Sequence, residues 1–192
     1  MGGGDGLDAV AARENSAARE GRVGEDVPMV VSVHPPSELS KATWTDADFA
    51  DMGWHDCRIR AISVSEHEDD TVPPGRLLLD LDYIVGWVDP VRPDRHFTFW
   101  IAPATLVFDQ AWNITGDLGP LHDLLEIDDV HRIDSPDERP EPTWHIEGQN
   151  FDLRLRASGY RQYMRLPPQH VSQQVLTLAQ RDGLSFAERS FS

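Results

Sequence analysis

The chain has 192 residues, of which 33 are acidic and 17 basic, giving a formal net charge of -16 at pH 7. This length predicts one domain plus extensions, and 40% hydrophobic residues are enough to form its core. The charge argues against nucleic acid and anionic membrane surfaces as partners, because both attract cationic proteins. The single cysteine excludes a disulfide scaffold and any zinc or iron–sulfur site made of several cysteines.

The sequence carries no targeting pattern. Its N-terminus lacks the order of a signal peptide, and no stretch approaches the roughly 18 apolar residues that cross a bilayer. We therefore expect a cytoplasmic protein. Lys41 is the only lysine, and the preference for arginine, alanine, glycine and proline is typical of a GC-rich bacterial genome.

Residues 1–42 contain few large apolar side chains, so they bury too little surface to offset the entropy lost on ordering. We predict a disordered acidic tail over 1–42 and a single β-rich domain over 43–188. The domain should start with a short helix that Thr45 caps and Gly53 ends. Alternation over Arg58–Val64 then predicts a strand, with a bulge at Ala61-Ile62 where the apolar face changes parity.

Two long strands are expected in the middle of the domain. Alternation over Leu77–Trp87 predicts a strand with one buried face and with Asp80 and Asp82 on the other. A second β run covers Phe97–Phe108, and its Pro103, which cannot donate a backbone hydrogen bond, should lie at a bulge or an edge. Shorter strands are predicted at Trp112–Thr115 and, in preference to a helix, within Leu121–Asp134.

The C-terminal part of the sequence predicts a hairpin and then a helix. A turn at Ser158-Gly159 would pair the two strands of 151–166 and place nearly all their apolar side chains on one face. Apolar residues at 3.6-residue spacing over Val171–Ala179 predict an amphipathic helix. The expected fold class is α+β, a mainly antiparallel half-barrel or sandwich-like sheet with a short N-terminal and a C-terminal helix.

The segment Trp54-His55-Asp56-Cys57 contains the candidate catalytic residues, His55, Asp56 and Cys57. On a strand, His55 and Cys57 share a face and could form a nucleophilic pair. We favour a structural interpretation because no third, orienting group can be identified. In that interpretation Trp54 anchors the helix to the sheet, His55 or Asp56 caps loop backbone, and Cys57 packs as a small hydrophobe.

Asp80 and Asp82 are candidate binding residues. Their side chains should lie about 7 Å apart on one strand face, where paired carboxylates can hold a divalent cation or exchange protons. A solvated sheet face shows the same pattern, and we favour it. The eight histidines form no HxH, HxxH or HExxH pattern, so we predict no metal site and no cofactor.

Charge is segregated along the sequence. Residues 120–142 contain eight acids and two bases, whereas 154–189 contain six arginines and two acids. The predicted hairpin lines up an arginine stripe in which Arg156 and Arg161 lie opposite each other and need an anion. We expect that anion to come from the acidic segment, Asp123–Glu141, or from a bound ligand. The stripe residues are Arg154, Arg156, Arg161 and Arg165.

Three stretches carry a resemblance: Trp54-His55-Asp56, Asp80-Leu81-Asp82-Tyr83-Ile84 and the run from Ile101 to Phe108. Through them the chain, from about Trp44 to Leu184, resembles a family of uncharacterised small bacterial β-rich proteins. It is loosely similar to the acidic immunity proteins that neutralise bacterial toxins. This resemblance implies a sheet framework and an interaction with another protein.

The leading hypothesis is a non-enzymatic acidic module that binds another, basic protein as an immunity-type or regulatory partner. It rests on the net charge and on the absence of a catalytic or cofactor motif. The alternative is a small hydrolase or metal-dependent enzyme that uses His55, Asp56, Asp80 and Asp82. These four side chains must then share one site.

Overall fold

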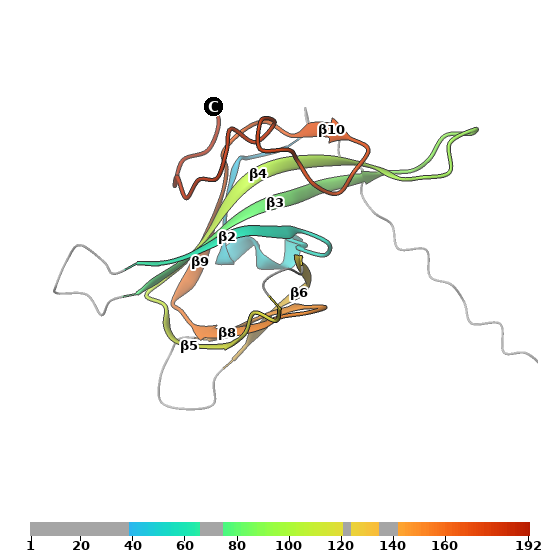
Figure 1. The fold of residues 1–192 in the computed structure, drawn as a ribbon. Coiled ribbons are helices and arrows are strands. Elements are labelled where there is room, and N and C mark those ends of the chain that lie inside the picture. Colours follow the sequence, from blue (N-terminus) through green and yellow to red (C-terminus); the bar gives the residue numbers. More distant parts are fainter. Residues whose placement is uncertain (1–38, 66–74, 121–123, 135–141) are drawn as a thin grey trace, which may run out of the picture. The chain divides into compact units, whose positions relative to one another are not determined.

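The computed structural model describes residues 39–65, 75–120, 124–134 and 142–192, so most of the predicted tail lies outside it. In these residues, ten antiparallel strands form one open sheet, and a single 3-10 helix precedes the second strand (Figure 1). None of the described helical structure is long and apolar enough to span a membrane. The elements are β1 (Thr43–Thr45), η2 (Asp46–Asp51), β2 (Arg58–Ser65), β3 (Arg76–Val88), β4 (Thr98–Asp109), β5 (Trp112–Asp117), β6 (Leu125–Ile133), β7 (Thr143–Gly148), β8 (Asp152–Arg156), β9 (Gly159–Met164) and β10 (Gln169–Val171).

The strand order is β1-β9-β4-β3-β2-β6-β7-β8-β5, and β10 pairs with β4 beyond the end of β9. β2 joins the two parts of this sheet, which are β1-β9-β4-β3 on one side and β6-β7-β8-β5 on the other. It pairs with β3 along nearly all its length, but with β6 only at Arg58 and Ile59. The sheet turns at this short junction, as Figure 1 shows.

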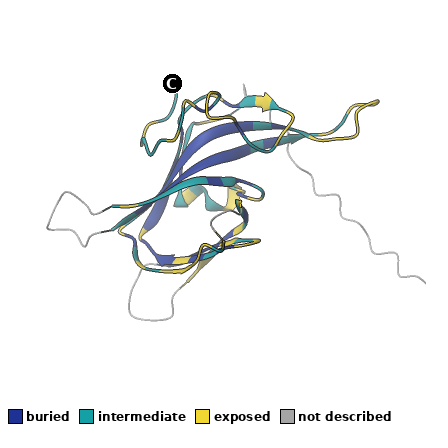
Figure 2. Ribbon diagram, viewed as in Figure 1, coloured by how far each residue is buried: buried dark blue, intermediate teal, exposed yellow. Residues whose placement is uncertain are grey.

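The core lies inside the turn of the sheet. Trp144 on β7 is fully buried, and its ring centroid is 5.4 Å from that of Tyr160 on β9 and 5.5 Å from that of Phe108 on β4. Because β7 lies far from β9 and β4 in the strand order, these contacts show that the sheet folds back over its own apolar face. Phe49 of η2 fills the space between, 5.5 Å from Trp144. β3 and β4 are buried along most of their length (Figure 2).

Several local predictions are confirmed. The backbone N–H of Thr45 donates to Asp48 at 2.9 Å at the start of η2, and this helix ends at Asp51, just before Gly53. The register between β2 and β3 shifts between Ile59 and Ala61, so the bulged residue is Arg60, one position before the predicted bulge. β5 and β6 are present where the two shorter strands were expected, whereas β7 has no counterpart in the prediction.

Pro103 lies at a local edge inside an interior strand. β9 pairs with β4 only up to Ala104, and β10 resumes the pairing at Ile101. The carbonyl of Pro103 accepts a hydrogen bond from the backbone N–H of Arg165 at 2.9 Å, in the break between β9 and β10. Since the N and O of a strand residue point to the same side, the nitrogen that cannot donate also faces this break.

The predicted hairpin over 151–166 is wrong. β8 pairs with β7 and β5, whereas β9 pairs with β4 and β1, so the two consecutive strands enter opposite parts of the sheet. Their apolar side chains still face one core, since Leu155 and Tyr160 are both buried there. Facing a common core satisfies the same alternation that a hairpin would, and alternation alone cannot distinguish the two.

The predicted C-terminal helix is also wrong, and with it the α+β class. Residues 172–192 contain no helix or strand, and Leu178, which a helix would bury, is exposed. The backbone N–H of Leu176 donates to Asp82 at 3.2 Å and that of Ser185 donates to Asp80 at 3.1 Å. Carboxylates of β3 thus take up backbone donors that a helix would satisfy internally.

Candidate functional site

His55 and Asp56 lie side by side, with Nε2 of His55 3.5 Å from Oδ1 of Asp56, but Cys57 does not join them as a nucleophile. Cys57 is fully buried, and its Sγ accepts a hydrogen bond from a backbone N–H of β3 at 3.3 Å. Burial raises the pKa of its thiol to about 12, which makes it a poor nucleophile at neutral pH. His55 is exposed, and a hydrogen bond to the carbonyl of Asp128 raises its pKa. Asp56 accepts a hydrogen bond at 3.1 Å from the side-chain amide of Gln174.

Trp54 fixes the end of η2 to the sheet. It is buried, and its indole Nε1 donates to Oε1 of Gln162 on β9 at 2.8 Å. This contact agrees with the structural interpretation of residues 54–57, in which Trp54 anchors the helix to the sheet.

Asp80 and Asp82 are fully buried, so the solvated face expected for them is wrong. They alternate along β3 with Leu79 and Leu81, which belong to the core together with Cys57. The two carboxylates therefore point to the other face of the sheet, where residues 172–192, the C-terminal segment, cover them.

Three arginines surround these carboxylates and form a buried charge cluster with them. Arg165 donates to Asp80 at 2.6 Å, and Arg181 pairs with the same oxygen. Arg181 and Arg60 each lie 3.4 Å from Asp82. Burial raises the pKa of Asp82 and lowers that of Arg181, while the opposite charges of the pair oppose both shifts.

The buried charge cluster fastens the C-terminal segment to the sheet. Besides accepting the two backbone N–H groups, it holds the segment through Arg60, which donates to the carbonyl of Leu176 at 2.7 Å. Asp80 and Asp82 lie under this segment, whereas His55 is exposed to solvent. The four side chains of the hydrolase hypothesis do not share one pocket.

The arginine stripe is dispersed because the hairpin does not form. Arg161 binds Asp109 through two hydrogen bonds of 2.9 Å, Arg165 belongs to the buried charge cluster, and Arg154 donates to Asp152 at 3.1 Å. The guanidinium carbon of Arg156 lies 5.0 Å from the ring centroid of Trp112.

The acidic segment, Asp123–Glu141, was expected to supply the anion for Arg156 and Arg161, and this expectation is wrong for Arg161. Its carboxylate partners, Asp109 and Glu188, both lie outside Asp123–Glu141. Part of the acidic segment, residues 135–141 and Asp123, lies outside the described residues.

Four carboxylates form a row across the outer face of the four neighbouring strands β6, β7, β8 and β5. Asp129 on β6 lies opposite Glu147 on β7, Glu147 opposite Asp152 on β8, and Asp152 opposite Asp117 on β5. We call these four residues the carboxylate row. Asp129, Glu147 and Asp152 adjoin residues that face the core, such as Val130, Ile146 and Leu153, and Asp117 lies on the same face as its partner Asp152, so the row points to solvent. Like charges placed directly opposite each other are destabilising.

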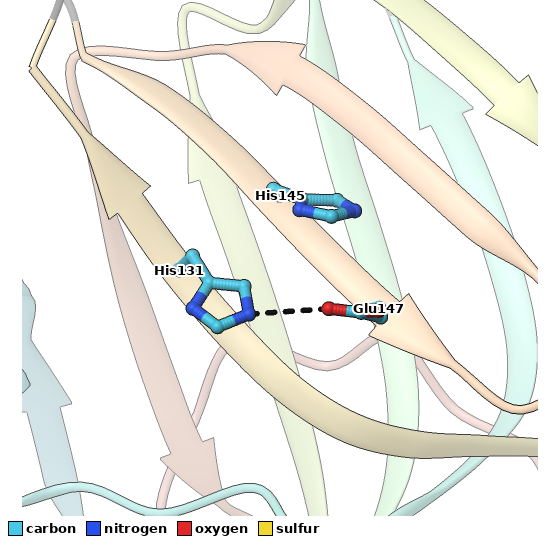
Figure 3. Close-up of side chains that lie close together, drawn as sticks. All are labelled: His131, His145 and Glu147. Atoms are coloured by element: carbon cyan, nitrogen blue, oxygen red, sulfur yellow. Dashed lines mark hydrogen bonds and ion pairs between the residues drawn. The ribbon is translucent and has the colours of Figure 1, made fainter.

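A second row of side chains, next to the carboxylate row, carries two histidines. His131 lies opposite His145, and His145 opposite Arg154. Nε2 of His131 is 3.3 Å from Oε2 of Glu147 (Figure 3). Nε2 of His145 is 2.6 Å from Oδ2 of Asp152. Hydrogen bonds from Arg154 and His145 lower the pKa of Asp152.

His131, His145 and Glu147 form a cluster whose ligand atoms all lie within 4.8 Å of one another. We call these three residues the histidine site. The sequence search for histidine pairs missed it because its two histidines come from neighbouring strands. One signal for this site is present in the sequence, the run His145-Ile146-Glu147. On a strand, His145 and Glu147 point to the same face and can share a ligand.

Comparison of the chain with protein-family models, with curated proteins and with solved structures finds no match.

Proposed function

We propose that the protein is a non-enzymatic binding domain whose acidic sheet face engages a basic protein. The observation that carries this proposal is the carboxylate row, with its four side chains directed outward across four neighbouring strands. A cationic partner would relieve the repulsion within the row, and the row would attract that partner over a distance of about one Debye length.

The placement of the arginines supports the same proposal. Arg60, Arg165 and Arg181 are used inside the buried charge cluster, and Arg76 and Arg161 pair with Asp109 and Glu188. These five cations are unavailable to balance the carboxylate row, whereas Arg154 pairs with one of its four members, Asp152, at 3.1 Å. The immunity-type or regulatory role expected from the sequence is one form of this proposal, with a basic bacterial protein as the partner.

The test measures binding of a fluorescent arginine-rich peptide at several salt concentrations, with a chelator present so that metal ions cannot bridge the two. The test variant is Asp117→Asn/Asp129→Asn, which removes the two ends of the row. Asparagine keeps the oxygens that accept the backbone N–H groups of Gly119 and Val130. The control is Asp89→Asn/Asp94→Asn, which removes two exposed charges between β3 and β4.

We expect the row variant to bind the peptide more weakly and with a smaller salt dependence, and the control to bind as wild type does. An equal loss in both variants would mean that the peptide responds to net charge alone, which contradicts the proposal. A pull-down from the native lysate, repeated with the row variant as bait, then identifies the partner.

A further inference from the structure

We propose that the histidine site binds a divalent first-row transition-metal ion. His131, His145 and Glu147 supply two imidazole nitrogens and one carboxylate oxygen, a set that suits Zn²⁺ and its neighbours better than Ca²⁺ or Mg²⁺, which prefer oxygen ligands alone. This inference does not rest on the proposed protein partner, because the ion itself is the ligand, although the ligand Glu147 also belongs to the carboxylate row.

The spacing of the ligand atoms is close to what the ion requires. Two ligands bound at about 2.0–2.1 Å in a tetrahedral site lie about 3.3 Å apart. Nε2 of His131 and Oε2 of Glu147 are 3.3 Å apart. The histidine site needs only modest side-chain rotation to close, since all its ligand atoms lie within 4.8 Å and both His131 and Glu147 are partly exposed.

Neighbouring carboxylates are placed to orient both imidazoles. Metal-binding histidines usually donate their second ring N–H to a carboxylate or a carbonyl. Asp152 is 2.6 Å from Nε2 of His145, which leaves Nδ1 of that ring for the metal. Asp129 is 3.7 Å from Nδ1 of His131, whereas Glu147 is close to the other ring nitrogen, Nε2. His145 is mostly buried, so its ring is held in place.

The local charge also favours a divalent cation. The site and its neighbours contain three carboxylates, those of Glu147, Asp152 and Asp129. They also contain one guanidinium, that of Arg154, which donates to Asp152 at 3.1 Å. With both histidines neutral, two negative charges remain, and a divalent ion balances them. Three protein ligands leave a fourth position open to water, as in many zinc sites that are not purely structural.

The test titrates Zn²⁺ into the full chain by calorimetry and follows thermal stability in parallel. We expect one saturable site and a higher melting temperature with Zn²⁺. His131→Ala and, separately, Glu147→Gln should weaken binding by more than the roughly 10–100-fold that loss of an outer-shell partner costs, and should abolish the thermal shift. Both residues are partly exposed, so both variants should fold, which circular dichroism without metal checks.

His55→Ala is the matched control, because His55 is exposed next to acidic residues but lies outside the histidine site. It should bind Zn²⁺ as wild type does. Co²⁺ in place of Zn²⁺ should give visible d–d absorption of a nitrogen–oxygen site, which His131→Ala loses. Absence of saturable binding in wild type, or equal losses in His55→Ala and His131→Ala, would overturn the proposal.

Discussion

Arg181 and Asp80 lie 101 positions apart in the chain and form an ion pair in which neither side chain is exposed to solvent. This pair shows how a segment without helix or strand is held on a sheet. Charge pairing and backbone hydrogen bonds replace the continuous apolar stripe that would dock a helix. The stability of the domain should therefore depend on the balance of charges under the C-terminal segment.

Asp80→Asn should destabilise the protein more than Arg181→Met. The first change leaves three guanidinium groups with one carboxylate, whereas the second leaves two of each. Removing one member of a buried charge pair typically costs about 3–5 kcal/mol, and we expect Asp80→Asn to fall in this range. Urea unfolding of the two variants measures the difference. The reverse order would show that net charge does not control the cluster.

Trp144→Ala should cost much more stability than Trp87→Ala. Trp144 is fully buried and joins the two parts of the sheet, so its loss should cost about 3–5 kcal/mol. Trp87, which the apolar pattern of β3 places in the buried face, is only partly buried and packs on Phe97 and Phe99 near the end of the strand. Thermal melts of the two variants provide the comparison, and equal melting temperatures would contradict it.

Cys57 should make the protein less stable at alkaline pH. Burial raises the pKa of its thiol from 9.0 to about 12, so the folded state holds this proton more tightly than the unfolded state. The resulting stabilisation, on the order of 4 kcal/mol, is complete below about pH 9 and is lost as the pH rises toward 12. Unfolding free energies of wild type and Cys57→Ala, measured between these pH values, should converge or cross. Parallel curves would show that the thiol does not titrate in this way.

The strands with clear alternation could be predicted from the sequence because alternation reports a buried face directly. β3 and the bulge of β2 are examples, and Pro103 was located from its missing donor. Pairing is a different property. β8 and β9 carry the pattern of a hairpin, yet each pairs with strands that are distant in the sequence, and no local signal specifies this choice.

The environment of a polar face could not be predicted either. Asp80 and Asp82 alternate with leucines whether water or arginine lies above them. Their partners, Arg165 and Arg181, come from the C-terminal end of the chain, and Arg60 comes from the bulge of β2. The histidine site escaped detection for a related reason, because His131 and His145 become neighbours only through the pairing of β6 with β7.

Between β8 and β9 the chain passes from one part of the sheet to the other, and this path affects how the protein is made. β4 ends at Asp109, but β9, which covers its second edge, begins only at Gly159. At typical rates of synthesis, the ribosome needs about 3–10 seconds to produce the residues between them. Throughout that interval the apolar strand β4 presents an unpaired edge of the kind that recruits other chains. The nascent protein should therefore be most prone to aggregate, and most in need of a chaperone, between the synthesis of these two strands.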